Sequence, residues 1–197
     1  MNIKNVTIAG GGVLGAQIAY ITAFHGYNVT IWGRSEGSIE RVKSRIERLY
    51  NIFSKELEIA PTYIGQENPD YPRSFFNDKS EITEEKIEEL KNVNNKIYKD
   101  MKYTTDLDEA FSNADLVIEA IAEIVDEKKA FYEKISSHLK EDTILVSNSS
   151  TLLPSQFSEY TKREDKFLNL HFANNIWRQN VAEVMKHDKT SDESFES

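Results

Sequence analysis

The chain has 197 residues, 39% of them hydrophobic, and a formal net charge of -9, so it is long enough for one sizeable core. The acidic balance argues against nucleic acid or an anionic membrane as the main partner, because both need a basic surface. The chain contains no cysteine, which excludes disulfides and thiolate metal sites, and we assign no metal ligands.

The N-terminal stretch "MNIKNVTIAGGG" enters a strand almost at once and leaves no room for a signal peptide. No apolar run reaches the length of about 18 residues that a membrane span requires. We therefore expect a cytoplasmic protein.

Residues 4–33, "KNVTIAGGGVLGAQIAYITAFHGYNVTIWG", predict a strand, a glycine turn, a helix, a turn and a strand, which is the size of a βαβ unit. A long helix is expected from Ser38 to about Ala60, since apolar residues recur there at helical spacing and Pro61 ends the pattern. The next twenty or so positions hold most of the prolines and show no clean period. They predict an irregular excursion, followed by a second charged helix from roughly Thr83 to Lys96.

The remainder of the chain alternates strands with helices, which predicts a mostly parallel α/β sheet. The tail has a capping-box spacing from Thr190 to Glu193, which predicts the start of a helix. The remaining residues are too few to complete this helix. We therefore expect a truncated protein, with a dinucleotide-binding domain over 1–187 and a linker over 188–197. The expected domain includes a helical hairpin and insertion at about 38–100. Residues 101–121 are expected to form a strand, a short helix and a strand. A helix at 125–139 and strands at 143–150, 167–175 and 180–186 are expected to follow.

Gly10, Gly12 and Gly15 form a GxGxxG pattern that directly follows one expected strand and directly precedes a helix. The first glycine permits the tight turn, the second lets the backbone approach a pyrophosphate, and the third allows close helix packing. A helix N-terminus then faces the phosphate charge. This context predicts a Rossmann-like, doubly wound fold that binds a dinucleotide, with polar site residues at the carboxyl ends of its strands.

The end of the second strand, "TIWGRS", lacks the acid that usually accepts the ribose hydroxyls about 20 residues after the glycines. Gly33 stands there, followed by Arg34 and Ser35, which can donate to a 2′-phosphate. We therefore expect NADP, or use of both cofactors. The alternative is that Arg34 stacks on the adenine or pairs with Glu36, with NAD as the cofactor.

Several stretches occur together in a fixed order: "GGGVLGAQIA", "ADLVIEAIAE", "TILVSNSSTL", "HFANN" and "AEVM". In this the chain resembles the NAD-binding domain of the 3-hydroxyacyl-CoA dehydrogenases from Met1 to about Lys186. The resemblance implies NAD as cofactor and hydride transfer between a 3-hydroxyacyl-CoA, such as 3-hydroxybutyryl-CoA, and the 3-ketoacyl-CoA. It also implies an α-helical C-terminal domain, which we expect to lie outside this truncated chain, and a homodimer of the full-length protein.

The resemblance also implies roles for individual residues. His171 matches the catalytic base, and an imidazole can exchange a proton near neutral pH. Glu183 matches the carboxylate that orients this base, while Ser150 and Asn174 match donors to the reacting oxygen. The cofactor positions implied by the glycine motif, the strand end and the resemblance are Gly10, Gly12, Val13, Leu14, Gly15, Arg34, Ser35, Glu123, Lys128 and Asn148.

Structural alternatives accompany these roles. His171 could be a core histidine, Glu183 a solvent-facing strand residue, and Ser150 a helix cap. The long helix also carries a row of arginines on one face, which either binds coenzyme A phosphates, as the family does there, or is a solvated face paired with acids on the same helix. The arginines are Arg41, Arg45 and Arg48, and the acids are Glu40 and Glu47.

Two departures from the family stand out, of which the first concerns the acyl pocket and the second the helical hairpin. The family usually has "HFFNP", whereas this chain has "HFANNIWRQN", and residues 61–79 exceed the usual hairpin. The leading hypothesis is an NAD(P)-dependent dehydrogenase of the 3-hydroxyacyl-CoA type acting on a small molecule. The alternatives are a dehydrogenase of another small hydroxy acid or a catalytically silent nucleotide-binding protein.

Overall fold

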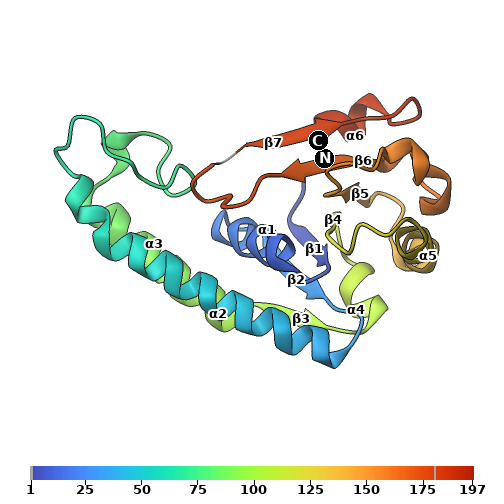
Figure 1. The fold of residues 1–197 in the computed structure, drawn as a ribbon, viewed down its shortest axis with the longest axis horizontal. Helices are drawn as coiled ribbons and strands as arrows, with labels where there is room; N and C mark the ends of the chain where they lie inside the picture. Colours follow the sequence, from blue (N-terminus) through green and yellow to red (C-terminus); the bar gives the residue numbers. More distant parts are fainter. Residues whose placement is uncertain (1, 180) are drawn as a thin grey trace.

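The computed structural model of the chain describes residues 2–179 and 181–197. Its strands form one seven-stranded sheet in the order β3-β2-β1-β4-β5-β6-β7 (Figure 1). Neighbouring strands are parallel except β6 and β7, which are antiparallel. The strands are β1 (Asn5–Ala9), β2 (Asn28–Trp32), β3 (Lys102–Thr104), β4 (Leu116–Glu119), β5 (Ile144–Ser147), β6 (Phe167–Phe172) and β7 (Ala182–Met185). The expected Rossmann-like, mostly parallel sheet is confirmed.

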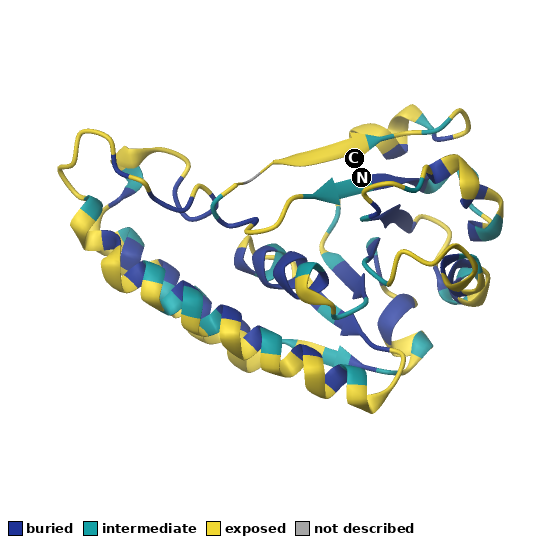
Figure 2. Cartoon of the chain, viewed as in Figure 1, coloured by how far each residue is buried: buried dark blue, intermediate teal, exposed yellow. Residues whose placement is uncertain are grey.

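Helices cover both faces of this sheet, as the doubly wound prediction requires. Successive strand residues enter different cores: Ile8 and Ile118 pack on the side of α1, α2 and α3, while Ala9 and Val117 pack on the side of α4 and α5. The central strands β1, β4 and β5 are therefore mostly apolar and buried over nearly their whole length (Figure 2). The helices are α1 (Val13–Phe24), α2 (Glu36–Ile59), α3 (Glu84–Asp100), α4 (Leu107–Phe111), α5 (Val125–Ile135) and α6 (Asp192–Glu196).

The helices α2 and α3 form the expected hairpin after β2, seen as the long antiparallel pair in Figure 1. The rings of Tyr50 and Tyr98 stack across it with centroids 4.6 Å apart. Asn94 is buried between the hairpin and α1, where it accepts from the Tyr20 hydroxyl at 2.6 Å. The helix α3 continues four residues beyond the expected end at Lys96, because buried Ile97 extends its apolar face.

The excursion between α2 and α3 is irregular, as expected, but it belongs to the core. Tyr71, Phe75 and Phe76 are buried there, and the Phe75 ring lies 4.9 Å from Phe24 and 4.8 Å from Phe53. This excursion and the later loops contain short 3-10 helices at Ala60–Tyr63, Lys79–Glu81, Ser136–His138, Pro154–Gln156, Ser158–Thr161 and Glu164–Lys166.

The tail starts a helix as expected, but its N-cap is Ser191 and not Thr190, where the capping-box spacing begins. Ser191 caps α6 by accepting from the Ser194 amide at 3.1 Å, and buried Thr190 donates its hydroxyl to the Phe167 carbonyl at 2.7 Å. Within the described part of the chain, every helix is too short or too polar to cross a bilayer.

Asp115 joins the starts of β1 and β4. Its carboxylate accepts from the amides of Lys4 at 2.9 Å and Asn5 at 2.8 Å, and from the Lys140 ammonium. Partial burial raises the pKa of this carboxyl, but the Lys140 and backbone hydrogen bonds outweigh it and lower the pKa to about 2. The ionised form is therefore favoured by the folded state.

Asp115→Asn is expected to reduce the free energy of unfolding by about 2 kcal/mol at pH 7. Because the folded pKa lies below the unfolded one, this stabilisation is complete above pH 5 and disappears as the pH falls toward 2. Urea unfolding should show about half of the difference from the wild type already lost at pH 3. Exposed Asp142→Asn is the control, and a difference that does not depend on pH would contradict the assignment.

Candidate functional site

A cleft of about 590 Å³ opens where β1, β4, β5 and β6 end. This is the edge at which open α/β sheets bind ligands, so the expected location of the site residues agrees with the geometry. The lining comes from four segments, Gly12–Gly15, Glu119–Ile121 with Glu123 and Lys128, Asn148–Ser150, and His171–Asn174.

The glycine turn is shaped for a close approach to the backbone. Gly10 has φ of +112°, and a Cβ at this position would lie 2.6 Å from the Ala120 carbonyl oxygen. A Cβ on Gly12 would meet nothing within 4 Å, so the backbone at the start of α1 is open to the cleft. The first turn of α1 carries no acid. These residues fit the pyrophosphate of a dinucleotide, whose negative charge the N-terminus of α1 favours.

His171 and Glu183 face each other directly across the antiparallel β6 and β7 pair. His171 Nδ1 lies 3.1 Å from Glu183 Oε2, and the imidazole is about one quarter exposed. The other ring nitrogen, Nε2, is thus left for the cleft that His171 lines. Glu183 lies outside the lining and touches the site through His171.

Glu123 holds the segment that follows β5. It accepts from the Ser149 hydroxyl at 2.8 Å and from the Ser150 amide at 3.1 Å. The side chain of Ser150 is exposed at the cleft. Asn148 accepts from the Phe172 amide at 3.0 Å through its side-chain oxygen, so it links the ends of β5 and β6. Asn174 also lines the cleft, and the structure therefore brings Ser150, His171 and Asn174 together.

Beneath the cleft lies a buried ion pair of which only Lys128 was anticipated. The Lys128 ammonium contacts both oxygens of Glu119, at 2.6 and 2.7 Å, and both side chains are at most 1% exposed. The hydroxyls of Tyr132 and Ser147 donate to the same carboxylate at 2.5 and 2.7 Å. Burial, and then the charge of Glu119, raise the pKa of Tyr132 well above its usual value. The sequence signal was an acid ending the apolar strand "LVIE".

The loop after β6 turns away from the cleft toward the hairpin. The Trp177 ring packs on Phe53 at 5.8 Å, and Arg178 donates to Glu56 Oε1 at 2.6 Å. Burial opposes but does not cancel the effect of that hydrogen bond, which raises the pKa of Arg178. Ser74 of the excursion donates its amide to the Trp177 carbonyl at 3.0 Å. The two departures from the family motif are thus one packed unit, and Asn180 lies outside the described residues.

Arg34 and Ser35 lie at the end of β2, outside this cleft lining. Ser35 is the N-cap of α2 and accepts from the Ser38 amide at 3.3 Å. Of the arginine row, Arg45 donates to the Gly11 carbonyl at 3.1 Å, which ties α2 to the glycine turn. The expected partner Glu40 instead pairs with Lys43 at 2.7 Å.

Comparison with known proteins gives one consistent family. The sequence matches the model of the 3-hydroxyacyl-CoA dehydrogenase NAD-binding domain over residues 5–71 and 76–197. Mitochondrial hydroxyacyl-coenzyme A dehydrogenases of rat and human are each 29% identical over 99% of this chain. The chain spans 54% of the length of each.

Solved structures agree on the fold. A diketoreductase, described for dual catalysis of dicarbonyl compounds, matches all of this chain and 59% of its own at a TM-score of 0.78 and 37% identity. The 3-hydroxybutyryl-CoA dehydrogenase of Escherichia coli matches all of this chain and 35% of its own, with a TM-score of 0.72 and 24% identity.

Lys128→Met is expected to reduce the free energy of unfolding by about 3 to 5 kcal/mol, because it leaves the Glu119 carboxylate buried without a counter-charge. The double variant Glu119→Gln, Lys128→Met should recover much of this loss. Urea unfolding measures both, with exposed Lys134→Met on the same helix as control. A loss below about 1 kcal/mol in Lys128→Met would mean that the pair is solvated.

Proposed function

Since the chain belongs to the 3-hydroxyacyl-CoA dehydrogenase family through that family's NAD-binding domain, we propose that the protein interconverts a 3-hydroxyacyl-CoA and the 3-ketoacyl-CoA. A nicotinamide cofactor, when bound, supplies the hydride acceptor for this oxidation. The observation that carries the proposal is the pairing of His171 with Glu183 at the edge of the glycine-lined cleft.

His171 would accept the proton of the 3-hydroxyl group at Nε2. Its Nδ1 lies 3.1 Å from Glu183 Oε2, so a proton held on Nδ1 donates to this carboxylate and leaves Nε2 as the basic atom. Glu183 is about two thirds exposed, yet its register opposite His171 keeps it in reach. It would stabilise the imidazolium that forms when the proton is taken up.

Ser150 and Asn174 would donate hydrogen bonds to the reacting oxygen from the same cleft. Glu123 supports this arrangement, because its contacts to Ser149 and to the Ser150 amide fix the segment that carries Ser150. The hydroxyl of Ser150 thus approaches the substrate from a backbone that is already held in place.

A second candidate is the reduction of a dicarbonyl compound that carries no coenzyme A. Two observations favour it: the 37% identity to a diketoreductase, and the loop after β6, where Trp177 and Arg178 pack on α2 in place of the usual family motif. This loop directly follows Asn174 of the cleft lining, so its change would alter the entry to the site while the His171 chemistry stays the same.

Substrate profiling of the protein at its full natural length separates the two candidates. The proposed function requires kcat/KM for acetoacetyl-CoA to exceed that for a matched free dicarbonyl compound, ethyl acetoacetate, by at least about tenfold, since binding of the coenzyme A moiety adds to transition-state binding. The reverse order would favour the second candidate. Cofactor binding without turnover of either compound would support a silent nucleotide-binding protein.

His171→Ala and Glu183→Ala are expected to give strongly non-additive losses of kcat/KM, because the carboxylate acts only through the imidazole. The histidine variant should lose about a hundredfold or more, and the double variant should lose about as much as the histidine variant alone. Steady-state kinetics measure this, with exposed Glu159→Ala as control. If the two single losses multiply in the double variant, the residues do not act as a unit.

A further inference from the structure

Position 33 lies where β2 ends beside the glycine turn. The Gly10 amide donates to the Trp32 carbonyl at 3.0 Å, and the Gly33 amide donates to the Thr104 carbonyl at 3.0 Å. Gly33 therefore continues the sheet between the turn and β3. In a dinucleotide fold the residue at this place meets the adenosine ribose, so its neighbourhood decides which ribose substituents can be held.

The space that an acid would need at position 33 is already filled. A Cβ there would lie 2.6 Å from Ser38 Oγ and 2.8 Å from Ile39 Cδ1. Ser38 Oγ is itself fixed, since it donates to the Ser35 carbonyl at 2.6 Å and accepts from the Ser35 amide at 3.1 Å. The packing thus disfavours the carboxylate that would accept both ribose hydroxyls and repel a 2′-phosphate, because Ser38 and Ile39 would have to move to admit it.

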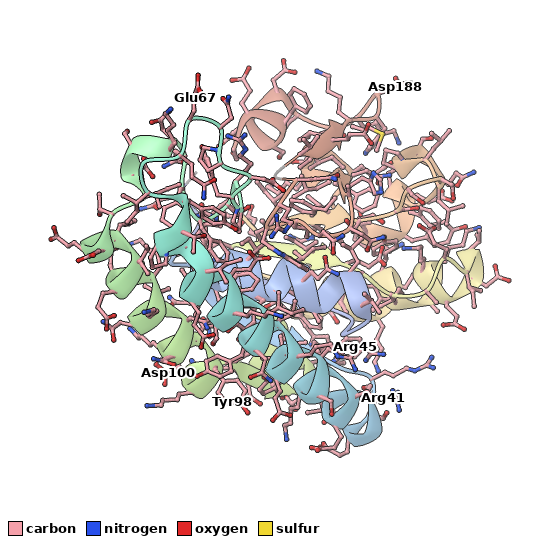
Figure 3. The ribbon with its side chains drawn as sticks, turned by 60° about the vertical axis from the view of Figure 1, so that its left-hand side comes forward. Arg41, Arg45, Glu67, Tyr98, Asp100 and Asp188 are labelled. Atoms are coloured by element: carbon pink, nitrogen blue, oxygen red, sulfur yellow. The ribbon has the colours of Figure 1, made fainter. Side chains whose placement is uncertain are left out.

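Three arginines come from the residues that follow position 33 and from the N-terminal half of α2. Arg34 follows Gly33 directly, and its side chain is 75% exposed. Arg41 Nη1 lies 3.5 Å from the point that a Cβ of Gly37 would occupy, so this guanidinium reaches back over the first turn of α2. Arg45, one turn further along, is held on the Gly11 carbonyl. Figure 3 shows Arg41 and Arg45 leaving the N-terminal part of α2.

The nearby carboxylates do not cancel this charge. Glu36 accepts from the Thr105 hydroxyl at 3.2 Å, on the side of the connection between β3 and α4, and Glu40 pairs with Lys43. Glu127 of α5 lies 3.6 Å from Arg34, but both side chains are about half exposed or more. An exposed ion pair of this kind contributes little free energy, so a phosphate group can replace Glu127 as the partner of Arg34.

We infer that the chain binds the 2′-phosphate of NADP(H), with Arg34 as the main ligand and Arg41 as the second. The inference rests on the proposed function, because it requires a dinucleotide in the glycine cradle. A guanidinium offers a planar fork of donors that matches phosphate geometry. The missing acid removes the repulsion, and the two arginines supply the attraction.

The test is the affinity of the 197-residue chain for NADPH and NADH, measured by calorimetry at one fixed salt concentration. We expect the wild type to bind NADPH at least as tightly as NADH. Arg34→Ala should weaken NADPH binding by about ten- to a hundredfold, the size of one charge-assisted hydrogen bond, and leave NADH binding unchanged. Arg41→Ala should give a smaller loss in the same direction. Arg48→Ala, an exposed arginine further along α2, is the matched control and should change neither affinity.

A gain-of-function variant tests the packing argument. Gly33→Asp with Ser38→Ala and Ile39→Val restores the acid and removes the hydroxyl and the methyl group that stand closest to a Cβ at this position, so NADH should then bind more tightly than NADPH. Circular dichroism of each variant verifies the fold. Raised salt should weaken NADPH binding more than NADH binding, since the 2′-phosphate contact is exposed and screened.

Three outcomes would overturn the inference. The first is a wild-type preference for NADH above tenfold, and the second is an Arg34→Ala variant with unchanged NADPH affinity. The third is an equal loss of affinity for both cofactors in Arg34→Ala and in Arg48→Ala, which would indicate only a non-specific electrostatic attraction between the arginines and an anionic ligand. Failure of the premise that the chain binds a dinucleotide gives a different result, in which the wild type binds neither NADPH nor NADH. Failure of the proposed reaction alone appears only in the turnover assay and leaves the binding result unchanged.

Discussion

The turn at Gly10 is the constraint on which the site depends. β1 lies between β2 and β4 in the sheet, so the chain must leave β1 through a narrow space flanked by both strands. With φ of +112° and the Ala120 carbonyl against its α-carbon, Gly10 makes this exit without a side chain. The start of α1 is then directed across the ends of β4 and β5, which is where the cleft opens.

The buried pair of Glu119 and Lys128 fixes the chain at the end of β4, the strand next to β1. β4 ends in a carboxylate that is fully buried and takes donors from Lys128, Tyr132 and Ser147. The amide of Ile121 also donates to it, at 2.8 Å. These contacts fix the chain just after β4, where Ala120 closes on Gly10. The Glu119 and Lys128 pair thus holds this wall of the cleft in place, while the ends of β5 and β6 contribute Ser150, His171 and Asn174 to the lining.

The strands, the long helix and the glycine turn could be predicted from the sequence, because each depends on residues that are close together in the chain. The glycine spacing, the apolar strands and the helical period of residues 38–60 each depend on neighbours in the chain. The pairing of His171 with Glu183 came from a family resemblance, and the register of β6 with β7 accounts for it. Buried contacts between distant segments could not be read this way. Glu119 was missed because its three side-chain partners are spread between positions 128 and 147.

The loop after β6 is a second case in which contacts between distant segments could not be predicted from the sequence. "HFANNIWRQN" and the excursion at 61–79 looked like two separate departures, since more than 90 residues divide Ser74 from its hydrogen-bond partner Ile176. In the folded chain Trp177 fills a gap beside Phe53, Arg178 neutralises Glu56, and Ser74 binds the loop backbone. Neither segment could change alone without leaving an apolar surface or a charge without its partner. The loop after β6 and the extended hairpin therefore constrain each other, although they lie far apart in the sequence.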